Sequence, residues 1–128
     1  MKFQAESNQA TYTVGAHGPG FVEVQGVRYE QGICLGAETA PQAWGVDGFA
    51  ALAEQDFLQL AEQQPELVII GTGGAQRFAH PSLLRPLIER GIGFEIMSTA
   101  AACRTYNILV GEGRRALAAL LVDPAPQR

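Results

Sequence analysis

Two short apolar runs, at residues 67–70 and 93–97, constrain the fold more than any other feature of this sequence. The first run reads Leu-Val-Ile-Ile and lies between a proline and a glycine, so it is too short for a buried helix and predicts a strand. The second run predicts another strand, and leucines at helical spacing after Pro81 predict a helix between them. This order favours a right-handed parallel βαβ unit. The loops after both strands then lie at one edge of the sheet, where open α/β sheets usually bind ligands.

A change to helical periodicity marks residues 49–63, whose apolar side chains fall on one face. The helix can begin after Asp47, which is a suitable cap, or later, near Glu54. Both starts are compatible with the pattern.

The last part of the chain predicts one more helix and leaves one segment open. Ser98 or Thr99 can cap a helix that runs to about residue 110. Residues 115–122 are ambiguous, because alanine favours a helix whereas the length and position of the segment favour a last strand. Strands and helices that alternate in this way are typical of an α/β fold.

The first third of the chain predicts a small antiparallel β unit. Its clearest part is a hairpin, because runs of period two at residues 21–24 and 27–29 flank Gln25-Gly26. Glycine at the second turn position accepts a positive φ. The remaining predictions here are strands at residues 11–14 and 33–35 and loops at residues 15–20 and 36–41.

Composition indicates one ordinary globular domain, with 47% apolar and 17% charged residues in a chain of 128. The net charge of -4 disfavours a nucleic-acid partner. No apolar run reaches the ~20 residues that span a bilayer, and the first residues lack the apolar core of a signal peptide. Cys34 and Cys103 lack the spacing of a disulfide framework, so we expect a cytoplasmic protein with free thiols. We expect a flexible N-terminus at residues 1–9, a single α/β domain at 10–122 and a tail at 123–128.

The glycine-rich segment at residues 71–74 suggests a nucleotide loop, but its pattern does not fit one. The dinucleotide fingerprint requires a third glycine where this chain has Gln76, and the Gly-Lys-Ser/Thr of a phosphate loop is missing. Thr72 and nearby backbone N–H groups can still hold a small anion. The alternative is a tight turn in which glycine tolerates a positive φ and close packing.

The segment at residues 97–107 gathers many polar side chains at a helix start. Cys103 lies near the first turn beside Arg104, which can lower a thiol pKa, and His80 is the only candidate base at the same edge. The alternative is that small residues here let the helix approach the sheet, with Cys103 as a buried and inert thiol. With two histidines in all and no Asp/Glu cluster, we expect no zinc or iron site.

These segments together resemble a domain-of-unknown-function family that includes the mitochondrial complex I assembly factor 3 and the adipogenesis-associated domain-containing protein. The residues that carry the resemblance lie at 18–20, 26–29, 44, 66–73, 86, 91–107 and 111–115. The resemblance implies three layers, with a central mixed and mostly parallel sheet, helices on both of its faces and a small N-terminal antiparallel β unit. It also implies that the chain from Arg114 onward is the last strand, antiparallel to the others.

The resemblance implies a non-enzymatic module that binds a protein partner, as the eukaryotic members do when they help to assemble respiratory complex I. The alternative is a pocket protein or enzyme that acts on a small anion or metabolite at the edge formed by residues 71–76 and 97–107. A third reading is purely structural, with both segments packing helices on the sheet. No catalytic residue, metal ligand or cofactor is assigned, and no oligomeric state is predicted. The candidate pocket residues are Thr72, Gly73, Gln76, Arg77, Met97, Thr99, Cys103, Thr105, Tyr106 and Asn107.

Overall fold

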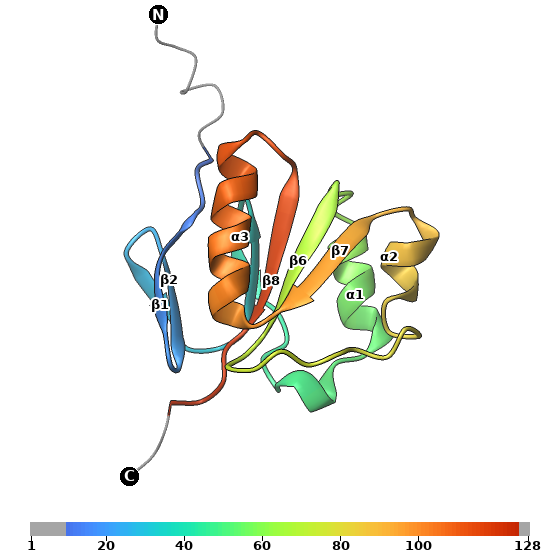
Figure 1. Cartoon of the computed structure of the whole chain (residues 1–128), viewed down its shortest axis with the longest axis horizontal. Coiled ribbons are helices and arrows are strands. Elements are labelled where there is room, and N and C mark those ends of the chain that lie inside the picture. Colours follow the sequence, from blue (N-terminus) through green and yellow to red (C-terminus); the bar gives the residue numbers. More distant parts are fainter. Residues whose placement is uncertain (1–9, 126–128) are drawn as a thin grey trace, which may run out of the picture.

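The computed structural model describes residues 10–125, which form two sheets and three α-helices (Figure 1). The expectations for residues 1–9 lie outside this part of the chain. The strands are β1 (Val14–Gly18), β2 (Phe21–Val24), β3 (Val27–Tyr29), β4 (Ile33–Gly36), β5 (Thr39–Ala43), β6 (Leu67–Thr72), β7 (Gly93–Met97) and β8 (Ala116–Leu121). The helices are α1 (Glu54–Ala61), α2 (Arg85–Glu89) and α3 (Thr99–Gly111), with a 3₁₀ helix at Phe49–Ala51 before α1.

The main sheet has the strand order β5-β4-β8-β6-β7. β6 pairs in parallel with β7 on one side and with β8 on the other, which confirms the predicted βαβ unit. β4 is antiparallel to β8 and to β5. The sheet is therefore mixed, and β4 alone among its strands runs in the opposite direction.

The last strand corrects one expectation. Residues 116–121 do form a strand, which resolves the ambiguity, but β8 runs parallel to β6 rather than antiparallel to all other strands. The reason is the crossover through α3. Its 13 residues return the chain from the end of β7 to the opposite edge of the sheet, so the next strand starts where β6 and β7 start.

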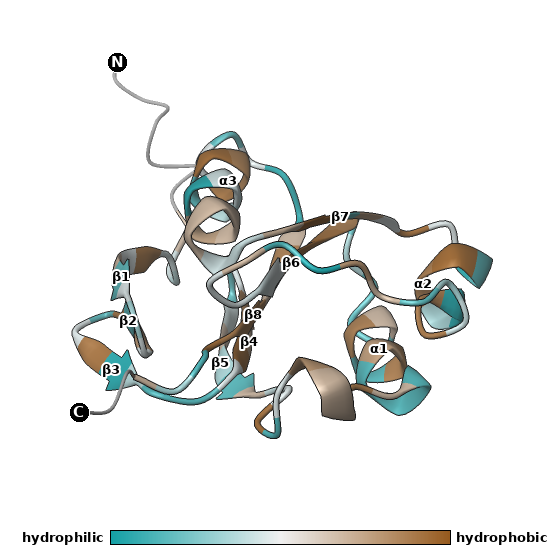
Figure 2. Cartoon of the chain, turned by 60° about the horizontal axis from the view of Figure 1, so that its bottom comes forward, coloured by the Kyte–Doolittle hydropathy of each residue, from teal (hydrophilic) through white to brown (hydrophobic). Residues whose placement is uncertain are grey.

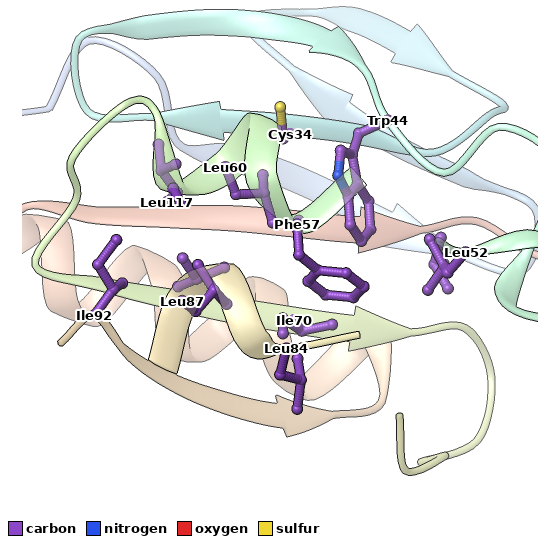
Figure 3. Close-up of a cluster of buried hydrophobic side chains, with 14 residues drawn as sticks. Cys34, Trp44, Leu52, Phe57, Leu60, Ile70, Leu84, Leu87, Ile92 and Leu117 are labelled. Carbon is purple, nitrogen blue, oxygen red and sulfur yellow. The ribbon is translucent and has the colours of Figure 1, made fainter. Parts of the chain in front are cut away.

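The two faces of the main sheet are covered by different layers (Figure 2). Side chains of a strand alternate between faces, and β6 shows this directly. Val68 and Ile70 belong to the cluster formed with α1 and α2, whereas Ile69 belongs to the cluster formed with α3 and the small sheet. In Figure 3, Phe57 lies between Trp44 and Ile70, and the two aromatic rings meet edge to face with centroids 5.7 Å apart. The predicted three-layer arrangement is confirmed.

The small sheet has the order β1-β2-β3 and packs beside α3 (Figure 1). The predicted hairpin between β2 and β3 is confirmed, and positive φ angles of 51° at Gln25 and 78° at Gly26 form its turn. β1 begins at Val14, so it occupies part of the predicted loop rather than residues 11–14. β4 belongs to the main sheet rather than to this unit, because it pairs with β5 on one side and β8 on the other, and all four of its residues are buried.

β5 lies at residues 39–43, where a loop was predicted, and its composition explains the difference. Pro41 cannot donate a ladder hydrogen bond, but β5 is an edge strand, where proline is tolerated. α2 is also shorter than expected: residues 81–84 form turns, and the helix starts only at Arg85 with Pro86 in its first turn. α1 starts at Glu54, the later of the two predicted starts. No helix within residues 10–125 is both long and apolar enough to cross a bilayer.

Candidate functional site

The carboxyl ends of β6, β7 and β8 meet at one edge of the main sheet, where α3 begins (Figure 1). Thr99 joins three of these elements. Its hydroxyl accepts a hydrogen bond from the Gly73 N–H at 2.8 Å and donates one to the Leu121 carbonyl at 2.6 Å. The Thr99 N–H donates to the Gly73 carbonyl at 2.9 Å. Thr99 therefore ties the first turn of α3 to the ends of β6 and β8.

Thr72 closes the loop that follows β6. It is 1% exposed and is the one polar side chain in the buried core of residues 10–125. Its Oγ1 accepts the Arg77 N–H at 3.0 Å and lies 2.7 Å from the Ala75 carbonyl oxygen, so the hydroxyl bonds its own loop. The Gln76 side chain donates to the Ile96 carbonyl at 2.9 Å, which fixes the same loop against β7. Thr72 and Gln76 thus stabilise the loop by bonding main-chain groups.

Arg77, Met97 and Thr105 complete the candidates near this edge. The Arg77 guanidinium lies 5.7 Å from the centre of the Phe49 ring, on the side of α1. The Thr105 hydroxyl lies 3.5 Å from the Met97 sulfur, which is a weak contact within the α3 layer. The side chains of Arg77 and Thr105 thus contact different layers of the fold.

Tyr106 and Asn107 contact a different part of the fold. The Tyr106 hydroxyl donates to the Tyr12 carbonyl at 2.7 Å, and burial raises its pKa. The Asn107 amide donates to the Val14 carbonyl at 2.8 Å and accepts the Val14 N–H at 2.9 Å. At ~1.5 Å per helical residue, Asn107 lies roughly 12 Å along α3 from Thr99. Both residues attach the small sheet to α3.

Cys103 lies within the α3–sheet interface and is 1% exposed. Burial raises the pKa of its thiol to about 12, and the nearby Arg104 charge lowers it by less. The thiol therefore stays protonated at neutral pH, and the thiolate is the reactive form. The ring of His80 contacts Ser82 instead, at 2.9 Å. These positions match the inert-thiol alternative.

A pocket of about 420 Å³ opens beside Thr99. We call it the strand-end pocket, and its walls are residues 17–21, 73–74, 98–100 and 121–124. Among the ten candidate residues, Gly73 and Thr99 are the two that line it. The sequence interpretation missed two parts of this wall: the turn of the first hairpin, which joins β1 to β2, and Asp123, which lies in the predicted tail. Only the position of Asp123 directly after the last strand could have indicated that it lies at this edge.

Asp123 is built into the pocket wall. Its carboxylate accepts the Gly74 N–H at 2.8 Å. Gly73 has a φ of 91°, a backbone conformation that favours glycine, and a Cβ there would lie 2.5 Å from a carboxylate oxygen of Asp123, so a larger residue would also displace this side chain. No group of three or more His, Cys, Asp or Glu side chains in residues 10–125 is arranged to hold a metal ion.

Comparisons with known proteins cover most of the chain. A family model described as "Protein of unknown function (DUF498/DUF598)" matches residues 14–121. NADH dehydrogenase (ubiquinone) 1 alpha subcomplex assembly factor 3 from Mus musculus is 34% identical over 94% of this chain. The chain spans only 65% of the length of that relative. An uncharacterised protein from Rhodobacter capsulatus is 36% identical, with 87% of this chain and 85% of that protein covered.

The fold itself also recurs in solved structures. The crystal structure of a protein from Bordetella parapertussis has a TM-score of 0.83 and 42% sequence identity, and the match covers 89% of this chain and 98% of that one. The sequence resemblance is thereby confirmed at the level of fold and of family. This chain belongs to the family of proteins of unknown function described as DUF498/DUF598.

Proposed function

We propose that this chain is a non-enzymatic module that binds a protein partner in the manner of an assembly factor. One observation carries the proposal: the side chains best suited to chemistry bond the main chain instead. The Thr72 hydroxyl bonds backbone groups of its own loop, and Thr99 and Asn107 direct their polar atoms to backbone groups of neighbouring elements. Such bonds stabilise a fold, and they hold the Thr99 hydroxyl proton and one donor and one acceptor of the Asn107 amide on backbone groups rather than on a substrate.

Two further points support a binding role. The thiol of Cys103, the candidate nucleophile of the α3 segment, is buried with a raised pKa, so it is poorly suited to attack a substrate. The similar protein from Mus musculus carries the name of an assembly factor, and its similarity extends over 94% of this chain. We therefore infer that the region which this chain shares with the assembly factor is the region that binds a partner.

Affinity capture tests the proposal. We expect the tagged chain to retain one protein from its native lysate in near-stoichiometric amount. Excess untagged chain should abolish retention, because both copies compete for the same partner surface. A lysate that leaves no retained protein, or retention that the untagged competitor does not reduce, would contradict the proposal.

A small-anion pocket is the second candidate, and the strand-end pocket is the observation that favours it. Its volume of about 420 Å³ falls within the ~300–1,000 Å³ typical of ligand sites. However, Asp123 places a negative charge in the wall, which repels an anion. We therefore expect phosphate or acetyl phosphate at ~10 mM to leave the melting temperature unchanged. A rise that disappears when Ala100→Phe fills the pocket would favour the second candidate instead.

A further inference from the structure

We propose that the strand-end pocket receives an extended segment of a partner protein in which an apolar side chain adjoins a lysine or arginine. The inference rests on the proposed protein-binding function and names the surface that performs it. It follows from three features of the pocket: its apolar walls, its one acidic group and one backbone donor.

The walls of the pocket are mainly apolar. They bring together Phe21 from the first hairpin, Leu121 and Val122 from the end of β8, and Pro19 and Pro124 from the flanking turns. These residues come from two separate sheets, so the pocket lies where the layers diverge beyond the start of α3. An apolar side chain placed there would be removed from water on several sides, which is the main source of affinity in such pockets.

The charge of the pocket selects a basic neighbour. Among the described residues that line the pocket, Asp123 is the one acidic residue, and its bond to the Gly74 N–H uses one of several acceptor positions of the carboxylate. The guanidinium of Arg28 lies 4.0 Å from the centre of the Phe21 ring, but Glu30 neutralises it through an ion pair of 3.0 Å. The chain as a whole has a net charge of -4. A lysine or arginine of the partner therefore complements both the pocket and the chain.

The first turn of α3 supplies a donor for a peptide carbonyl. Three of its first four N–H groups are already bonded: Thr99 to Gly73, Ala101 to the Ser98 hydroxyl and Ala102 to the Ser98 carbonyl. Within residues 10–125, the fourth of these groups, the Ala100 N–H, has no hydrogen-bond acceptor. Ala100 is exposed and lines the pocket. A neutral carbonyl satisfies this group without the repulsion that Asp123 would impose on an anion.

Two matched tripeptides test the inference by NMR titration of the ¹⁵N-labelled chain. The probes are Ac-Leu-Lys-Leu-NH₂ and Ac-Leu-Glu-Leu-NH₂, with n-hexylamine as a small-molecule probe. We expect the lysine peptide to shift amide signals of residues 17–21, 98–100 and 121–124 with millimolar affinity. The glutamate peptide should bind at least about threefold more weakly, as the loss of an exposed ion pair implies. n-Hexylamine keeps the positive charge but lacks the peptide carbonyl and the adjoining leucine side chains, so it should also bind at least about threefold more weakly.

Two variants of the pocket, each with a matched control outside it, locate the binding. Asp123→Asn keeps an acceptor for the Gly74 N–H but removes the charge, so the lysine peptide should bind it about threefold more weakly. Asp47→Asn removes the same charge at an exposed site outside the pocket and should bind normally. Ala100→Phe should abolish binding, whereas Gln55→Phe, at an exposed site on α1, should not.

Four results would overturn the inference: no shift, shifts outside the pocket, equal binding of the two peptides, or n-hexylamine binding as tightly as the lysine peptide. The last result would indicate a small amine as the ligand. The proposed function fails separately. A partner captured equally by the wild-type and Ala100→Phe chains would remove the pocket inference and leave the proposed function intact. If the lysine peptide binds the pocket but no partner is captured, the proposed function is contradicted, and the preference of the pocket for a basic peptide still stands.

Discussion

Replacement of Thr99 by valine is expected to lower the free energy of unfolding by about 3 kcal/mol, because two part-buried backbone groups lose their partner. The hydroxyl accepts the Gly73 N–H at 2.8 Å and donates to the Leu121 carbonyl at 2.6 Å. Valine has nearly the same shape, so it fills the space but leaves both groups unsatisfied. Each such group costs roughly 1–3 kcal/mol when it stays buried. Thermal and denaturant unfolding should show a melting temperature lower by about 10 °C.

Thr99→Ser is the matched control, since serine keeps the hydroxyl and loses only a methyl group. Its cost should be about 1 kcal/mol, the usual value for one buried methylene-sized group. If the valine variant unfolds within about 0.5 kcal/mol of the wild-type chain, the tie between α3 and the two strand ends is energetically unimportant. Thr99 would then be better explained as a residue that contacts a ligand.

The parts of the fold that could be predicted are those with a strong local signal. The run at residues 67–70 is apolar on both faces because β6 is covered on both, and this pattern needs no knowledge of the partner strands. The hairpin turn at Gln25-Gly26 requires positive φ angles that only a few residues accept readily. The parallel arrangement of β6 and β7 followed from the handedness of βαβ connections.

The errors concern strands that are defined by their neighbours. β5 contains Pro41 and exposed positions, so it has no apolar alternation, and it is a strand only because β4 pairs with it. β4 could not be assigned to the main sheet because its second partner, β8, lies about 85 residues further along the chain, as the pair Cys34 and Ala119 shows. The direction of β8 likewise depends on where α3 returns the chain.

The candidate site was predictable only in part. The rule that parallel strands end at one edge correctly placed Thr72 and Thr99 at the same edge. There the Thr72 hydroxyl lies 3.2 Å from the Met97 carbonyl oxygen, and the Thr99 hydroxyl accepts the Gly73 N–H at 2.8 Å. The one signal for Asp123 is its position just after the last strand, and nothing near the first hairpin turn in the sequence indicates that the turn faces α3. The partners of Asn107 depend on where the small sheet docks, which is also a tertiary property.

Asn107→Ala is expected to loosen the small sheet and to lower the free energy of unfolding by about 2–3 kcal/mol. β1 is an edge strand, and the Asn107 amide occupies its open edge by bonding both the N–H and the carbonyl of Val14, at 2.9 and 2.8 Å. Val14 is buried, so both groups lose a partner that water replaces poorly. Hydrogen exchange should accelerate in β1 and β2 while β6 and β8 stay protected. Ile108→Ala, at a neighbouring exposed position, should change the stability by less than about 0.5 kcal/mol.

Asn107→Asp makes one of the two hydrogen bonds to Val14, the one donated to its carbonyl, depend on pH. The ionised carboxylate still accepts the Val14 N–H but has no proton for the Val14 carbonyl, and its charge repels that oxygen. Protonation restores a donor, so the stability difference from the wild-type chain should narrow as the pH falls through the carboxyl pKa, normally about 4. A difference that is the same at every pH, together with unchanged exchange in β1, would show that the Asn107 amide does not hold the small sheet. The attachment would then depend on the Tyr106 hydroxyl and on apolar packing against α3.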